Sequence, residues 1–227
     1  MSGIAPLART GPDPMLKPRL RGVSHQWAFL ASLFSGAALI AIAPTGEARL
    51  AASVYAASMA ALFGTSALYH RVNWRSVAAR RRMRRADHSA IFLLIAGTYT
   101  PVALLALKGW LASAILIAVW AGAAGGIVLK LAWIDAPKPV IAAIYLVLGW
   151  VAVAALPEVA RRLGWAPTAL IIGGGVLYTA GAIVYARQRP DPWPATFGYH
   201  EVFHALVIGA AVMHYAAVAA FVIPRGT

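Results

Sequence analysis

Two histidines four residues apart, His200 and His204, form the pattern in this sequence that most directly indicates metal chemistry. On an α-helix, residues four apart share a face with β-carbons roughly 5–6 Å apart, so both imidazoles can reach one ion. Ser66 and His70 repeat this spacing, which places a hydroxyl one turn from a third imidazole. The sequence contains no cysteine, so any metal ligands must be histidines or carboxylates.

Three neutral imidazoles with one open position form a recurrent catalytic zinc arrangement, in which the metal activates water. Asp87 is then predicted to be a fourth ligand or a base that positions water, and its charge would offset that of the ion. Ser66 either supports the site through its hydroxyl or packs against its own helix. We therefore predict a Zn²⁺ site with His70, His200 and His204 as ligands and Asp87 and Ser66 as catalytic residues. Iron and manganese stay open, because these ligand types suit several ions.

The segments that must position these side chains are membrane spans. The chain has 227 residues, of which 61% are hydrophobic and 12% charged, against roughly 45–50% and 25% in soluble domains. Roughly 20 apolar residues in a helix cross the hydrocarbon core. The sequence predicts an all-α bundle of seven transmembrane helices at 25–43, 47–69, 88–107, 109–129, 139–156, 167–186 and 199–223.

The distribution of basic residues predicts the orientation of the bundle. With alternating sides, fifteen of the 20 Lys and Arg residues fall on the side of the N-terminus and five on the other. Cytoplasmic loops carry the Lys and Arg excess, so the N-terminus is predicted to be cytoplasmic and the C-terminus to lie outside. His70, Asp87, His88, His200 and His204 then all lie at the cytoplasmic ends of their spans.

The remaining charged residues and histidines have simpler interpretations. Residues 1–24 are predicted to form a disordered cytoplasmic arm before a single membrane domain at 25–227. The net charge of +13 follows from topology, and no nucleic-acid module is visible. Arg80 to Arg85 are interpreted as a topology determinant in contact with anionic lipid, with a specific headgroup site as the alternative. His25 and His214 are interpreted as interfacial or hydrogen-bonded, and Glu201 as a carboxylate beside the site or at the interface.

The chain resembles the hemolysin III branch of the progestin and AdipoQ receptor family. The motifs that carry this resemblance are Lys17–Gly22, Ser66–His70, Asp87–Ser89, Gly97–Pro101 and His200–His204. The resemblance implies seven spans, a cytoplasmic N-terminus, a location in the bacterial inner membrane and a zinc site at the residues predicted above, with Asp87 holding the water. It also implies a role in membrane homeostasis, and the related alkaline ceramidases suggest amide hydrolysis of a lipid.

Three functions follow as hypotheses. The first is a zinc-dependent hydrolase that cleaves an amide or ester bond of a lipid entering from the bilayer. The second is a non-enzymatic sensor or receptor of membrane state in which zinc braces the helix ends. The third, a pore-forming cytolysin, is disfavoured because the spans lack a polar stripe that could line a channel.

Overall fold

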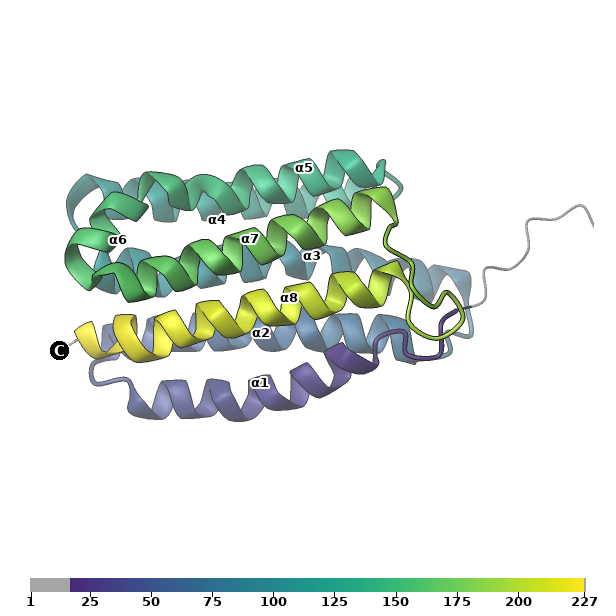
Figure 1. Ribbon diagram of the computed structural model, residues 1–227, viewed down its shortest axis with the longest axis horizontal. Coiled ribbons are helices and arrows are strands. Elements are labelled where there is room, and N and C mark those ends of the chain that lie inside the picture. Colours follow the sequence, from purple (N-terminus) through teal and green to yellow (C-terminus); the bar gives the residue numbers. More distant parts are fainter. Residues whose placement is uncertain (1–16, 227) are drawn as a thin grey trace, which may run out of the picture.

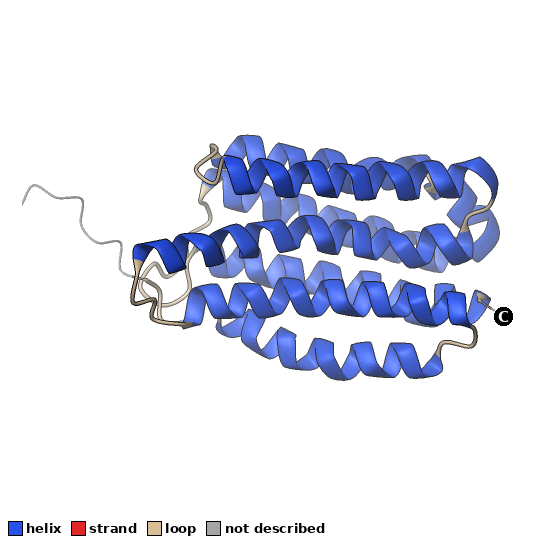
Figure 2. Ribbon diagram, turned by 180° about the vertical axis from the view of Figure 1, so that it is seen from behind, coloured by secondary structure: helices blue, strands red, loops and turns tan. Residues whose placement is uncertain are grey.

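The structure is an all-α bundle, seen here in a computed structural model that describes residues 17–226. Figure 2 shows that the regular elements of this part of the chain are helices, with no strand among them. The long helices are α1 (Val23–Ile42), α2 (Gly46–Arg71), α3 (Val77–Pro101), α4 (Gly109–Ala132), α5 (Lys138–Gly149), α7 (Trp165–Arg187) and α8 (Tyr199–Ala217). Shorter helical segments are η1 (Val102–Ala106), η2 (Trp150–Ala154), α6 (Leu156–Leu163), η3 (Val218–Val222) and η4 (Ile223–Arg225).

The long helices pack in a closed ring that follows the chain. Consecutive helices from α1 to α5 are neighbours, α5 packs on α7, α7 on α8, and α8 returns to α1 (Figure 1). Two buried apolar clusters fill the ring, one among α1, α2, α3 and α8 and one among α3 to α7, so α3 contributes to both. Helices that follow one another in the chain are therefore neighbours in most of the bundle.

The predicted spans match helices that suit a membrane. Six helices are long and apolar enough to cross a bilayer, and the pair Lys138–Ala154 and Leu156–Leu163 provides a seventh if it is counted as one bent span. The N-terminal segment and the connection between α7 and α8 lie at one end of the bundle, and the C-terminus lies at the other (Figure 1). Which end is cytoplasmic stays a prediction from the charge count.

The arginine run is part of a helix. The predicted spans had left it in the loop between the second and third helices. α3 begins at Val77, eleven residues before the expected start at His88, and projects beyond its neighbours (Figure 2). Ser76 caps this helix by accepting a hydrogen bond from the backbone N–H of Ala79 at 3.1 Å. Hydropathy marks only where a helix enters lipid, whereas arginine is a good helix former that extends the helix into water.

The fifth span continues beyond Leu156, where the sequence predicted its end, and it is bent. Its first part runs through the 3₁₀ segment Trp150–Ala154, and the 48° bend to Leu156–Leu163 follows at Ala155. Pro157 lies in the first turn of α6 and cannot donate a hydrogen bond to the preceding turn. The hydroxyl of Tyr99 pairs with the start of the 3₁₀ segment: it donates to the Gly149 carbonyl and accepts from the Ala152 N–H, both at 2.5 Å. This pairing satisfies backbone groups that lipid would leave unpaired.

Small residues let the helices approach closely at Gly122 and Gly126. A β-carbon at Gly126 would overlap the ring of Phe92 on α3, and one at Gly122 would come within 2.5 Å of Leu148 on α5. By contrast, a β-carbon at Gly125, on the same helix, would meet no atom within 4 Å. Gly125 and Gly126 therefore lie on the same helix but differ in how closely their surroundings pack.

We expect Gly126→Ala to lower the free energy of unfolding by about 1–3 kcal/mol, because the added methyl group must displace the buried Phe92 ring. Gly125→Ala is the matched control and should be neutral or stabilising, since it adds helix propensity in open space. The measurement is thermal unfolding of both variants in the same detergent. Equal losses in the two variants would show that α4 does not pack on α3 through Gly126.

Candidate metal centre

Three imidazoles converge at the end of the bundle that holds the N-terminal segment and the α7–α8 connection. His70 comes from the last turn of α2, and His200 and His204 come from the first two turns of α8. One ligand atom from each lies within 4.8 Å of the others, and the Nε2 atoms of His70 and His200 are 3.1 Å apart. The four-residue spacing on α8 therefore brings both of its imidazoles to one point, as the sequence predicted.

Asp87 and Ser66 lie beside the imidazoles. Asp87 Oδ2 is 4.0 Å from His70 Nε2, and Ser66 interacts with the Asp87 carboxylate. Both residues are buried, with 7% and 2% of their surfaces exposed. Ser66 is one turn from His70 on α2, and Asp87 lies ten residues into α3. All five predicted site residues are therefore brought together.

The donor set suits a zinc ion. Tetrahedral Zn²⁺ with Zn–N distances of about 2.0–2.1 Å places its ligand nitrogens roughly 3.4 Å apart, which the 3.1 Å pair nearly matches. Among residues 17–226, Asp87 has no Lys or Arg ion-pair partner, and His70 is the one basic side chain with a nitrogen within 4.0 Å of its carboxylate. A buried carboxylate without a cation is costly, so a metal ion beside the imidazoles would supply the missing positive charge.

His25 is the neighbour that sequence reasoning missed. Its ring stacks on that of His204, with centroids 3.6 Å apart and planes 11° apart, and it meets the edge of Phe63 on its other side. The side chain is 2% exposed, and neither ring nitrogen has a hydrogen-bond partner within the described residues. The available signal was position, because His25 opens α1 at the same end of the bundle as the other imidazoles. His214 lies elsewhere and hydrogen-bonds to the Ile171 carbonyl at 3.1 Å, as expected.

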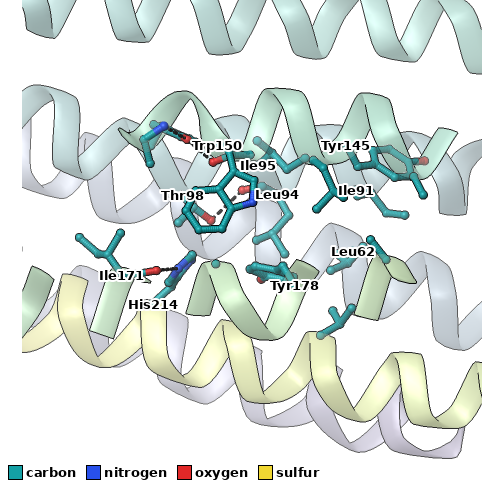
Figure 3. A pocket seen from close by; sticks show the side chains of 18 of the residues that line it. Leu62, Ile91, Leu94, Ile95, Thr98, Tyr145, Trp150, Ile171, Tyr178 and His214 are labelled. Carbon is teal, nitrogen blue, oxygen red and sulfur yellow. Dashed lines mark hydrogen bonds between the residues drawn. The ribbon is translucent and has the colours of Figure 1, made fainter. Parts of the chain in front are cut away.

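A cavity of about 180 Å³ leads from the imidazoles into the bundle. His200, His204, Asp87 and Ser66 line its polar end. Beyond them the walls are mostly apolar, and Figure 3 shows Leu94, Ile95 and Trp150 around the same space, with His214 and Ile171 across from them. The cavity thus joins a cluster of polar groups to a long apolar interior.

The N-terminal segment closes the end of α8 that carries His200 and His204. Arg21 Nε donates to Glu201 Oε1 at 2.5 Å, and Glu201 Oε2 accepts from the Gly198 N–H at 2.8 Å. Backbone N–H groups of Arg19 and Leu20 donate to the carbonyls of Ala195 and Thr196. Residues 17–22 of the predicted arm therefore pair with the α7–α8 connection, whereas its first sixteen residues lie outside the described part and their predicted disorder stays a prediction.

The chain is similar in sequence to known membrane proteins. Residues 14–215 match a protein family described as "Haemolysin-III related". The chain is 33% identical to "Hemolysin-3" of Bacillus cereus over 183 residues, covering 81% of this chain and 80% of that protein. It is 34% identical to "Hemolysin-3 homolog" of Bacillus subtilis over 159 residues, covering 70% and 71%. It is also 25% identical to human "Monocyte to macrophage differentiation factor" over 198 residues, covering 86% and 80%.

We expect Arg21→Ala to lower the free energy of unfolding by about 3 kcal/mol, because the 1% exposed Glu201 would lose its cation. Arg19→Ala removes the same charge from an exposed position in the same segment and should change stability little. Equilibrium unfolding in mixed micelles measures both. A loss no larger for Arg21→Ala than for Arg19→Ala would mean that the ion pair does not hold the segment to α8.

Proposed function

This chain belongs to the haemolysin-III related family of multi-pass membrane proteins, and on that premise we propose that it is a zinc-dependent hydrolase of a lipid amide or ester. One observation carries the proposal: the imidazoles of His70, His200 and His204 lie together beside a carboxylate, and two of them and the carboxylate line the polar end of an apolar cavity. A lipid presents the same pattern, with a polar linkage at one end of an apolar chain. Membrane homeostasis is the process that such an activity would serve.

The ligands would be the ring nitrogens of His70, His200 and His204. A zinc ion held by three imidazoles supplies Lewis-acid chemistry, because it activates water and polarises a carbonyl oxygen. His200 and His204 are rigidly spaced by one helical turn, whereas His70 joins them from another helix. His25 would hold the His204 ring in plane by stacking on it.

Asp87 would act as the proton carrier. Its Oδ2 atom lies beside His70, where it can accept a proton from the attacking water and return it to the leaving amine or alcohol. The hydroxyl of Ser66 would orient the carboxylate during these transfers. The apolar walls of the cavity would hold the acyl chain and exclude bulk water. Hydrolysis would then yield a fatty acid and the remaining part of the lipid.

A second candidate is a non-enzymatic sensor in which zinc has a structural role. The observation in its favour is that the imidazoles come from α2 and α8, which the bound metal would tie together at one end of the ring. Pore formation has no comparable support, because the cavity walls beyond the polar end are largely apolar and do not suit ions. The word hemolysin stands in the names of the Bacillus relatives and describes those proteins.

We expect His204→Ala to lower zinc affinity by more than roughly 100-fold, because it removes a direct ligand, whereas loss of a supporting group costs about 10–100-fold. His214→Ala is the matched control, since His214 borders the same cavity but hydrogen-bonds to Ile171. The measurement is the zinc content of both detergent-purified variants by inductively coupled plasma mass spectrometry. Equal zinc in both would exclude the proposed ligand set.

We expect Asp87→Asn to retain zinc but to lower lipid turnover by about 10²–10⁴-fold, because an amide cannot carry the proton. The assay measures fatty acid released from ceramide, from acyl esters and from total lipid extract by the zinc-loaded protein. Arg19→Ala, on the exposed N-terminal segment, serves as the active control. Zinc-loaded protein that binds one metal per chain yet releases no fatty acid from any lipid would favour the structural role over the hydrolase.

A further inference from the structure

The arginine run at the start of α3 is divided between two faces of the helix. Arg81 and Arg84, three residues apart, donate to the Asp135 carboxylate at 2.9 and 2.8 Å. The hydrogen bond from Arg84, together with the charges of both guanidinium groups, holds the pKa of Asp135 below its usual range. The Asp135 carboxylate is therefore ionised and paired with Arg81 and Arg84. Arg82 and Arg85 are turned about 100° from these residues, and within residues 17–226 neither has an ion-pair partner.

Arg82 and Arg85 line a groove between α3 and α4. Ala86 and Ser89 continue their face of α3, and Ile127 and Leu131 form the opposite wall from one face of α4. Arg82 is exposed, Ser89 is buried, and Leu131 is 52% exposed, so the groove opens outward. Figure 1 shows α3 and α4 beside each other at the end of the bundle where the chain enters. The groove thus passes from an arginine-rich end to an apolar surface that faces lipid.

Two polar groups in this groove lack partners. Arg85 Nε and Ser89 Oγ are both buried, and neither has a hydrogen-bond partner among the described residues. Buried donors of this kind destabilise a protein unless a ligand or water satisfies them. Both are donors, and a guanidinium group and a hydroxyl together suit the oxygens of a phosphate. The missing partner is therefore an acceptor with negative charge.

We propose that the groove between α3 and α4 binds an anionic glycerophospholipid. Its phosphate accepts hydrogen bonds from Arg82, Arg85 and Ser89, and an acyl chain lies along Ile127 and Leu131. Two positive charges that have no ion-pair partner among residues 17–226 favour a lipid with net negative charge over a zwitterionic one, whose ammonium group they would repel. This site lies outside the cavity that contains the imidazoles and does not depend on the proposed hydrolase activity.

The test compares two double variants that remove equal charge from adjacent faces of one helix. Arg82→Gln/Arg85→Gln alters the groove, and Arg81→Gln/Arg84→Gln alters the pair bound to Asp135. Native mass spectrometry of each purified protein, titrated with phosphatidylglycerol or phosphatidylcholine, reports the bound lipid. We expect wild type and the Arg81/Arg84 variant to bind phosphatidylglycerol alike, and the Arg82/Arg85 variant to bind it at least roughly tenfold more weakly.

Further outcomes separate a lipid site from simple charge attraction. Equal weakening in both double variants would overturn the proposal, because it would show a response to net charge alone. Equal affinity for phosphatidylcholine and phosphatidylglycerol would overturn it as well. Inorganic phosphate at millimolar concentration should not displace the lipid, since the apolar wall contributes to binding; displacement would show a free-anion site. Folding of the groove variant is checked by its thermal unfolding and its zinc content, which should match those of wild type.

Discussion

The buried carboxyl group of Asp87, at one end of the helical bundle, is the constraint on which the rest of the structure depends. Its neighbours among the described residues are imidazoles and a hydroxyl, with no Lys or Arg in ion-pair contact. An isolated carboxylate in such surroundings costs several kcal/mol even after relaxation. The cost is reduced if the imidazoles share a cation beside it, and α2, α3 and α8 must then stay in register. The ring of helices and the closing contact between Arg21 and Glu201 maintain this register.

Much of this arrangement could be predicted from the sequence because lipid permits few solutions. Apolar runs locate the helices, and charge asymmetry places His70, Asp87, His200 and His204 at one end, so their meeting in space follows from topology. The helical spacing of His200 and His204 then fixes their shared direction. These inferences need only the local spacing of residues and the rule that successive spans cross the membrane in opposite directions. The region that matches the family, residues 14–215, contains all the predicted site residues.

The parts that escaped prediction depend on contacts between distant segments. A lone histidine such as His25 gives no spacing signal, and its stacking on His204 arises only when α1 packs against α8. Arg21 resembles any basic residue before a span, although it pairs with a carboxylate 180 residues away. The helical start of α3 was missed because its first residues are mostly polar, and the hydropathy pattern marks only the apolar part of the helix. The 3₁₀ segment in the fifth span was missed because Tyr99, on another helix, satisfies its backbone groups.

Three irregular helical segments, η1, η2 and η3, border the cavity, and this location has a physical reason. Val102 in the π-turn after α3, Trp150 and Ala152 in the 3₁₀ break, and Val218 in the π-turn after α8 line the same space. Non-helical backbone is tolerated at membrane depth where protein or a cavity surrounds it, and is excluded where it faces lipid. Straight helices packed to native density would leave little room between them. The bundle therefore keeps regular helices at the histidine end, where ligand positions must be fixed, and departs from regular geometry where it encloses space.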